Sequence, residues 1–372
     1  MDPQTILQLT EGIRGLTWQS IAMMLVGGTL IYLAIAKGYE PVLLLPIGLG
    51  AIITNIPATG MMEEDGIFRL LKDFGINTEL FPLIIFIGIG AMTDFGPLLE
   101  RPYTVLLGAA AQFGIFGTLI IATLVGFKIN EAASIGIIGS ADGPTSIYVA
   151  SKLAPSLLAP VAVAAYSYMS LVPIIQPPIM RLLTTKSERR IHMPYSTRPI
   201  SKTTKVLFPI VVTVITGILV PMATPLIGFL MFGNLMREAG VVERLSLAAQ
   251  NELVNIVTIF LGFVIGATMV GSQFLKPDTV LIIVMGVVAF ALDTAAGVIF
   301  GKIMCYLSGR KINPLIGASG ISAFPMSARV VQKVGNEEDF TNHLLFHAMG
   351  SNTAGQIASV VAGGIVLALL LK

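Results

Sequence analysis

The sequence predicts an all-α polytopic membrane protein of about ten transmembrane helices, arranged in two inverted five-span repeats that each contain a re-entrant helical hairpin. Three observations support this fold class. Of the 372 residues, 54% are hydrophobic and 12% are charged, and the mean hydropathy is +0.84, so a soluble globule could not bury this much apolar surface. Apolar segments of roughly 20 residues recur along the chain, as a hydrocarbon core about 30 Å thick requires. Two further apolar segments are interrupted in the middle by glycine and proline.

The predicted organisation is a first repeat at 1–180, a basic loop at 181–205 and a second repeat at 206–372. The first span is expected to be retained rather than cleaved as a signal peptide, because only one basic residue, Arg14, precedes it. The ten spans are expected at 17–37, 41–57, 81–99, 103–127, 157–180, 206–222, 225–236, 252–270, 279–306 and 343–371.

Charge and cysteine content exclude several kinds of protein. The formal net charge of +2 gives no sign of a nucleic-acid partner. The single cysteine, Cys305, excludes an internal disulfide framework and a metal site built from cysteines.

The two interrupted segments, 129–154 and 313–334, are predicted to be re-entrant hairpins. The sequence GSADGPT at 139–145 divides the first into two arms, and GASGISAFP at 317–325 lies at the turn of the second. An arm of about 10 residues rises about 15 Å, which is half of the membrane. Irregular backbone at that depth requires cover from protein or water, so both turns should line a buried cavity.

Short sequence matches between the halves indicate an internal repeat. The triplet at 128–130 (KIN) recurs at 311–313, and the triplet at 89–91 (IGA) recurs at 265–267, in the same order. Each half then holds five spans, with its hairpin between the fourth and the fifth. Because five is odd, the two halves have opposite orientations in the membrane, as in many secondary transporters.

The loop at 181–205 sets the predicted orientation. It contains seven basic residues and a single acid, Glu188, so it should be cytoplasmic. The first hairpin then enters from outside and the second from the cytoplasm, and their tips can meet near the midplane. The seven basic residues are Arg181, Lys186, Arg189, Arg190, Arg198, Lys202 and Lys205.

Asp142 is the strongest candidate for a functional residue, because it is an acid at the tip of a hairpin within the membrane. The competing structural role is a cap on the second arm, since Pro144 fits a first-turn helix position. The two roles are compatible. Asp94 and Asp293 are also intramembrane acids, but their distance from the turns favours helix-end or packing roles.

On the second hairpin, Arg329 could clamp a carboxylate through its planar fork or simply extend toward the cytoplasm. Asn313 and Ser322 supply neutral oxygen and amide groups, which suit a hard monovalent cation or a tight helix crossing. Tyr168 and Asn352 hold analogous positions in the spans that follow the two hairpins; two nearby tyrosines are equally typical of packing.

Several long motifs lie along the chain. They are GSADGPT at 139–145, AAYSYM at 164–169, QPPIM at 176–180, NPLIGASGISAFPMSAR at 313–329, NEEDF at 336–340 and HAMGSN at 347–352. Together these motifs resemble one family, the beta subunits of the sodium-translocating, biotin-dependent oxaloacetate, methylmalonyl-CoA and glutaconyl-CoA decarboxylases. The similarity covers essentially the whole chain.

The resemblance implies a membrane subunit that decarboxylates carboxybiotin, delivered by a separate biotin carrier, and couples this reaction to sodium export with uptake of a proton. It implies partners: the carrier, a carboxyltransferase subunit and a small membrane subunit, in an oligomeric complex of a prokaryotic cytoplasmic membrane. The chain lacks a biotin acceptor of the Ala-Met-Lys-Met kind. By analogy, the compact length of the chain favours an acyl-CoA as the substrate that the complex decarboxylates.

The resemblance also implies roles for individual residues. Arg329, Tyr168 and Asp142 would act in catalysis, with Arg329 meeting the carboxybiotin carboxylate and Tyr168 handling a proton. Gly317 would permit close backbone approach at the second turn. The implied carboxybiotin site comprises Arg329, Asn313, Gly317 and Ser322. The implied sodium site comprises Asp142, Asn313, Ser322, Asn352 and Tyr168.

A sodium-coupled carboxylate symporter without decarboxylase activity is the alternative, because its hairpin tips would carry the same residue types. The run at 313–329 and the proton donor Tyr168 favour the decarboxylase subunit, since a protein that only transports needs no such donor.

Overall fold

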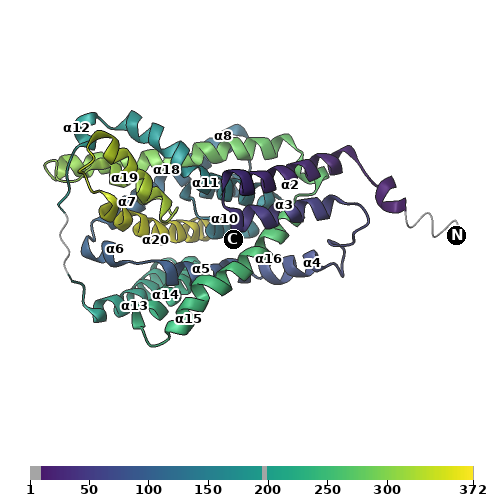
Figure 1. The fold of residues 1–372 in the computed structure, drawn as a ribbon, viewed down its shortest axis with the longest axis horizontal. Helices are drawn as coiled ribbons and strands as arrows, with labels where there is room; N and C mark the ends of the chain where they lie inside the picture. The colour runs from purple at the N-terminus through teal and green to yellow at the C-terminus, as the bar shows by residue number, and fades with distance from the viewer. Residues whose placement is uncertain (1–9, 195–198, 372) are drawn as a thin grey trace.

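The computed structural model describes residues 10–194 and 199–371, and every regular element within these ranges is a helix (Figure 1). Arg198 of the predicted basic loop lies outside the described residues. Six described helices are long and apolar enough to cross a membrane. Two bent pairs, Ile67–Ile76 with Leu80–Met92 and Pro155–Met169 with Leu171–Leu183, raise that number to eight if each pair is one span.

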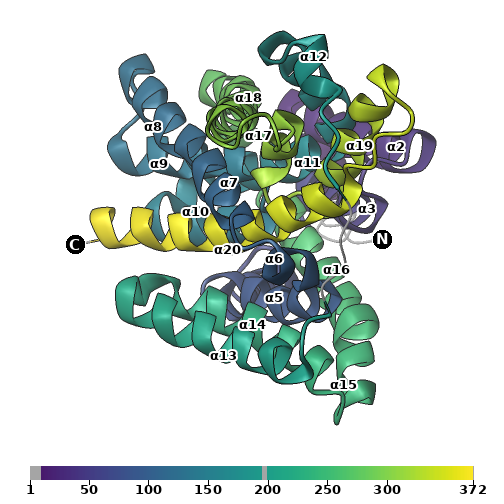
Figure 2. The same cartoon turned by 90° about the vertical axis from the view of Figure 1, so that its left-hand side faces the viewer.

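Half of the molecule is a panel of six helices that pack in the order α2, α3, α16, α5, α14 and α13. Figure 2 shows α5, α14 and α13 as a layer beneath α20. The bounds are α2 (Trp18–Lys37), α3 (Pro41–Asn55), α5 (Leu80–Met92), α13 (Lys202–Leu219), α14 (Thr224–Ala239) and α16 (Val254–Ala267).

Close backbone contact holds the panel together at two places. A Cβ on Gly266 of α16 would lie 2.1 Å from the carbonyl oxygen of Ile47 in α3. A Cβ on Gly90 of α5 would lie 1.8 Å from the carbonyl oxygen of Leu230 in α14. Only glycine allows this approach, which is how helices pack tightly in lipid without a hydrophobic driving force between them.

Short helical segments connect the panel helices and lead into the rest of the chain. A π-helical turn precedes both α5 and α16, the two helices that pack at the centre of the panel. The short segments are α4 (Ile67–Leu71), η1 (Lys72–Ile76), α6 (Gly96–Glu100), η3 (Pro155–Leu157), α12 (Lys186–Arg189), η4 (Pro221–Ala223), α15 (Glu243–Ala248), η5 (Ala249–Leu253) and α17 (Gly271–Phe274).

The other half of the molecule surrounds the two predicted hairpins with long helices. The first hairpin contains α9 (Ile129–Gly136), η2 (Ile137–Ser140) and α10 (Gly143–Leu153); the second contains η6 (Pro314–Gly320) and α19 (Met326–Glu338). Helical structure is interrupted in both at the predicted turns. The surrounding helices are α7 (Thr104–Ala111), α8 (Phe113–Val125), α11 (Leu158–Leu183), α18 (Pro277–Leu307) and α20 (Leu345–Leu370).

Candidate functional site

Asp142 lies at the break between the two arms of the first hairpin. Its side chain caps α10, because Oδ1 accepts a hydrogen bond of 3.2 Å from the backbone N–H of Thr145. Ala141 just before it adopts a left-handed conformation, with φ 54°, which turns the chain between the arms. The predicted cap is therefore present, and it leaves Oδ2 for other partners.

The second carboxylate oxygen of Asp142 joins the first hairpin to two other elements. Ser359 of α20 donates a hydrogen bond of 2.7 Å to Oδ2, and Ser322 of the second turn donates one of 3.3 Å. Asp142 is only 4% exposed. A buried carboxylate is thus surrounded by one N–H and two hydroxyl groups from three separate segments, with no cationic side chain among these partners.

The two turns meet directly, as the sequence predicts. The backbone N–H of Ser322 donates a hydrogen bond of 2.8 Å to the carbonyl oxygen of Ser140. Ser322 therefore contacts the first hairpin through both its backbone and its side chain. A displacement of one turn would break or strain these hydrogen bonds to the other.

A cavity of 220 Å³ lies beside this contact. Its polar lining comes from Asp142, Ser322, Thr93 and Gln356, and the Thr93 hydroxyl donates a hydrogen bond of 3.0 Å to Oε1 of Gln356. Thr93 follows directly after α5, so the cavity is bounded by the panel as well as by the hairpins. The apolar lining consists of Phe86, Ile89, Met92, Ala141, Gly143, Pro144, Met169, Phe324 and Pro325.

Asn352 of α20 contacts the same turn. Its Nδ2 donates a hydrogen bond of 2.7 Å to the carbonyl oxygen of Ile321, the residue before Ser322. Its Oδ1 is buried and has no hydrogen-bond partner among the described residues. The side chain thus offers a free oxygen near the second turn, as a cation ligand would.

Tyr168 and Tyr166 face different parts of the molecule. The Tyr168 hydroxyl donates to the carbonyl oxygen of Ile283 in α18, and its ring lies against Gly286. A Cβ on Gly143 would lie 2.7 Å from the hydroxyl oxygen of Tyr166, so Tyr166 is the tyrosine that packs against the Asp142 turn. The tyrosine expected at the site from the sequence was Tyr168.

Asn313 and Gly317 contact protein rather than the cavity. Asn313 caps η6 through Leu315 N, and its Nδ2 donates to the carbonyl oxygens of Arg189 and Ile191, at 2.9 Å each. A Cβ on Gly317 would lie 2.0 Å from the carbonyl oxygen of Gly297, so this glycine permits close packing of η6 on α18. The structure brings Asp142, Ser322 and Asn352 to one turn but does not place these two residues with them.

Arg329 lies in the first turn of α19, and its side chain is exposed. Within residues 10–194 and 199–371 it forms no ion pair or side-chain hydrogen bond. Its neighbours Ala328 and Val330 are buried, so the guanidinium is held on the outer face of a well-packed helix.

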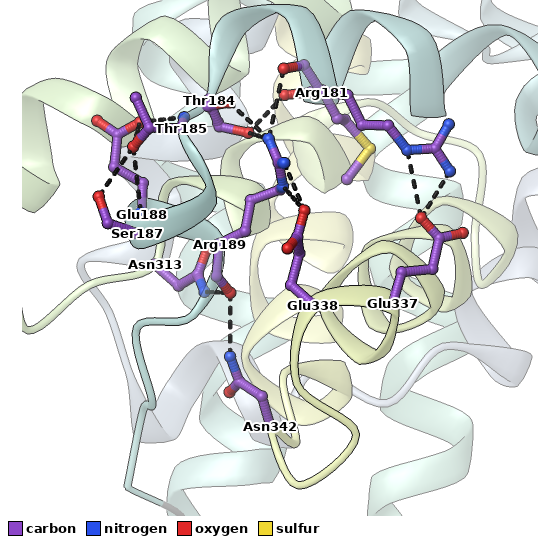
Figure 3. A network of polar contacts seen from close by, with 11 residues as sticks. Arg181, Thr184, Thr185, Ser187, Glu188, Arg189, Asn313, Glu337, Glu338 and Asn342 are labelled. Carbon is purple, nitrogen blue, oxygen red and sulfur yellow. Dashed lines mark hydrogen bonds and ion pairs between the residues drawn. The ribbon is translucent and has the colours of Figure 1, made fainter.

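The end of α19 is fastened to the loop between the halves by ion pairs (Figure 3). Arg181 and Glu337 approach to 2.6 Å, and the Nε of Arg189 donates a hydrogen bond of 3.0 Å to Glu338. Arg189 is only 6% exposed and also donates to the carbonyl oxygen of Thr184, at 2.6 Å. This network fixes the helix that carries Arg329.

Two carboxyl groups in this region have lowered pKa values. The hydrogen bonds that Arg189 donates lower the pKa of Glu338. Hydrogen bonds from Thr341 and from His192 lower the pKa of Asp339 to about 2. Both acids therefore stay ionised at neutral pH, which keeps the network intact.

Several residues of the site carry no signal in the sequence that sets them apart. Ser359, Gln356 and Thr93 are small or neutral polar residues in apolar runs, where they look like packing residues. Gln176, in the QPPIM motif, holds the second hairpin: it donates to Ala318 O at 2.8 Å and accepts from Ser327 at 2.9 Å. To find them, one would need to know which face of each helix points toward the site, and residue type does not give this.

The described residues contain no group of three or more histidine, cysteine or acidic side chains able to hold a metal ion together. A cation at the Asp142 turn would therefore rely on one carboxylate with hydroxyl, amide and backbone oxygens.

The family model for the Na+-transporting oxaloacetate decarboxylase beta subunit matches residues 19–370. This chain belongs to that family.

Curated beta subunits of this family are similar to the chain over nearly its whole length. The glutaconyl-CoA decarboxylase subunit beta of Acidaminococcus fermentans is 55% identical, over 97% of this chain and 96% of its own length. The methylmalonyl-CoA decarboxylase subunit beta of Veillonella parvula is 53% identical, over 97% and 95%. The oxaloacetate decarboxylase beta chain of Klebsiella pneumoniae is 48% identical, over 94% of both chains.

The chain is thus a sodium-transporting decarboxylase beta subunit, with several helices able to cross a membrane. A beta subunit is by its name one part of a larger complex. The similar beta subunits belong to decarboxylases of three different acids, so family membership alone leaves the acid open.

Proposed function

We propose that this beta subunit decarboxylates carboxybiotin on a separate biotin carrier and uses the reaction to export sodium, with uptake of one proton. The observation that supports the sodium step best is the buried Asp142 carboxylate at the meeting point of both hairpins, beside a cavity. Ionised groups at such depth are costly unless they bind an ion or a partner charge.

The proposed sodium site is built from Asp142, Ser322, Ser359 and Asn352. Carboxylate, hydroxyl and amide oxygens suit a hard cation. Each serine hydroxyl has lone pairs besides the proton that it donates to Asp142, so it can bond to the carboxylate and the cation together. Asn352 contributes its free Oδ1 from α20.

Arg329 is the proposed ligand of the carboxybiotin carboxylate. Its guanidinium is exposed and can form two parallel hydrogen bonds with a carboxylate. Asn313 and Gly317 hold the second hairpin in place, through the loop at Arg189 and through α18, respectively. Ser322 links this hairpin to Asp142. We therefore expect the first two to support carboxybiotin binding through the position of the hairpin.

Decarboxylation breaks the bond between the carboxyl carbon and the biotin nitrogen, releases carbon dioxide and leaves a biotin anion that takes up a proton. Transfer of a carboxylate from water to a dry pocket favours neutral carbon dioxide, and a positioned donor meets the developing anion. Tyr168 is the proposed proton-handling residue. Outward sodium movement costs about 2.3 kcal/mol per charge per 100 mV, which the reaction must supply.

For the membrane topology we propose two inverted repeats, 1–180 and 206–372, joined by a cytoplasmic loop at 181–205, with about ten spans. The pairing of the panel helices supports this proposal, because α16 packs on α3 as α5 packs on α14. A π-helical turn before both α5 and α16 is a further likeness between the halves. Four of the ten proposed spans are short or bent: α3, α14, and the two bent pairs.

The topology can be tested by accessibility of single cysteines near Glu64 and near Arg190, on a background in which Cys305 is replaced. An impermeant thiol reagent should label the two positions from opposite sides of the membrane. Labelling of both from one side would contradict the inverted repeats.

The function can be tested with the complex in sealed vesicles, supplied with free carboxybiotin or a carboxylated carrier. Carbon dioxide release should depend on sodium and should be accompanied by sodium movement. Vesicles that release none, yet accumulate a small carboxylate with sodium, would favour the symporter instead. Mass spectrometry of the purified complex should identify the proposed carrier, carboxyltransferase and small membrane subunit, and with them the acid.

A further inference from the structure

A second buried acid, Asp293, lies near the midpoint of α18 and has surroundings unlike those of Asp142. It is 0% exposed, and neither of its carboxyl oxygens has a hydrogen-bond partner among the described residues. The backbone N–H groups of Gly114 and Ile115, in the first turn of α8, lie close to this carboxyl but do not reach hydrogen-bond geometry.

Asp293 touches the first hairpin on the arm that leads to Asp142. A Cβ on Gly139 would lie 2.5 Å from Oδ2 of Asp293 and 2.8 Å from the carbonyl oxygen of Ala289. Ala289 lies one helical turn before Asp293, so its carbonyl lies on the same side of α18 and could accept a hydrogen bond from a protonated carboxyl. Any movement of the Gly139 arm along α18 changes the environment of Asp293.

No cationic side chain faces Asp293 from the described elements that pack against α18. The segments α7, α8, η2 and η6 carry no titratable residue. On α11, Tyr166 packs against Gly143, Tyr168 donates to α18 near Ile283, and Arg181 pairs with Glu337. On α9, Glu131 accepts from the backbone of Lys128, and on α18 itself Asp278 and Lys302 lie near the ends.

An ionised carboxylate without a cation or hydrogen bonds is strongly disfavoured in a dry interior. Sodium would need several oxygen ligands, whereas a proton needs only one carboxyl oxygen. Asp142 has hydroxyl groups around it, and Asp293 contacts glycine backbone instead. The two acids are thus suited to different cations.

We propose that Asp293 is a proton-binding carboxyl, which holds the proton taken up in the cycle while Asp142 holds sodium. This inference rests on the proposed function. The proton adds to one carboxyl oxygen, and the resulting O–H donates to the Ala289 carbonyl. When the first hairpin moves and uncovers the group, the proton is transferred to the biotin anion left by decarboxylation. Movement of a single hairpin then changes the surroundings of both acids together.

The first test is infrared spectroscopy of the complex at neutral pH, in light and heavy water. A carbonyl stretch of a buried protonated carboxyl should be present and should disappear in Asp293→Asn. It should persist in Asp94→Asn, the matched control, because that acid already accepts a hydrogen bond of 2.8 Å from Gly96 N. If no such band exists, or if it persists without Asp293, the proposal fails. This readout needs no activity, so it is independent of the proposed function.

The second test compares Asp293→Asn with Asp293→Glu in vesicles. The asparagine variant should keep sodium-dependent thermal stabilisation but lose turnover by roughly a hundredfold, the low end for loss of a proton-transferring group. The glutamate variant should recover part of it. Normal turnover of the asparagine variant, or no recovery with glutamate, would mean that Asp293 only packs against α8. If the asparagine variant does not assemble, the infrared band is measured in Asp142→Asn instead. A band that persists does not come from Asp142 and supports the proposal. A band that disappears comes from Asp142 and overturns the proposal. Wild-type vesicles that fail to release carbon dioxide would count against the proposed function instead.

Discussion

The two hairpins have the same plan but opposite surroundings. In the first, every residue from Ala132 to Ala150 is buried, and its only charged side chain over that stretch is Asp142. In the second, the turn is buried through Ala323, but α19 exposes Arg329 and Lys333 and buries Val330 and Val331 on its other face. One hairpin is enclosed by the protein, and the other has an exposed face.

This difference indicates what each hairpin can bind. A fully enclosed turn with one carboxylate and hydroxyl groups can accept a small cation and little else. An amphipathic arm with a free guanidinium can meet a carboxylate carried by another protein. The Ser322–Asp142 hydrogen bond connects the two hairpins, and with them the two proposed binding sites.

The largest effect is expected for Asp142→Asn, because it removes the only charge of the enclosed turn. The amide keeps an acceptor for the Thr145 cap but loses the charge that a sodium ion needs. Sodium-dependent decarboxylation in the reconstituted complex should be abolished while membrane insertion is unchanged. Normal turnover and sodium transport in this variant would remove the enclosed hairpin from the mechanism.

Arg329→Lys tests the hairpin with the exposed face and should have the next largest effect. Lysine keeps the charge but lacks the planar fork that holds a carboxylate through two hydrogen bonds. Carbon dioxide release from free carboxybiotin should fall strongly, and the sodium affinity should change much less. Lys333→Arg, one turn further along the exposed face, is the matched control. Equal losses of sodium affinity and decarboxylation would argue against separate roles for the hairpins.

Ser359→Ala should have an intermediate effect, confined to sodium binding. A hydrogen bond to a charged group contributes about 1.5–3 kcal/mol, so the sodium affinity should fall roughly ten- to a hundredfold. Sodium-dependent stabilisation against heat measures this change. Ser151→Ala on the same first hairpin is the control, since its hydroxyl donates to the backbone of Tyr148 instead. An unchanged affinity would exclude Ser359 from the site.

The smallest effect is expected from Asp339, beyond the end of the second hairpin. Its pKa is lowered to about 2 by hydrogen bonds from Thr341 and His192. A lowered pKa stabilises the folded protein above the ordinary value near 4, and this stabilisation is lost as the pH falls toward 2. Melting temperatures of the purified complex should therefore depend less on pH in that window for Asp339→Asn. Asp65→Asn controls for loss of one exposed carboxylate, and equal slopes in both variants would contradict the assignment.

The hairpin turns were the most predictable part of the molecule. Glycine and proline clusters located both breaks, and the Asp142 cap follows from Pro144 in the next turn. The ends of the membrane-spanning helices were less predictable, because apolar composition does not show at which residue a packed helix ends. The segment predicted at 41–57 is the 15-residue helix α3, and the pair Pro155–Met169 and Leu171–Leu183 is bent by 69°. The number of ten spans stays a prediction.

Within the site, residue type predicted less than helix phase. Tyr166 and Tyr168 are two positions apart, so they point in different directions on α11 and only one can face Asp142. Ser359 lies far along the chain from both turns and has no sequence feature that sets it apart from a packing serine. Asn313 is close to the second turn in sequence, but η6 carries it away to the loop at 189–191.

The ion pairs between the central loop and the end of α19 also constrain the order in which parts of the protein can fold. Arg189 is nearly buried and is separated from Glu338 by 149 residues. During synthesis the first half is complete long before its partner acids exist. The Arg189–Glu338 ion pair can therefore form only after the second hairpin has been made, which places this contact among the later steps of folding.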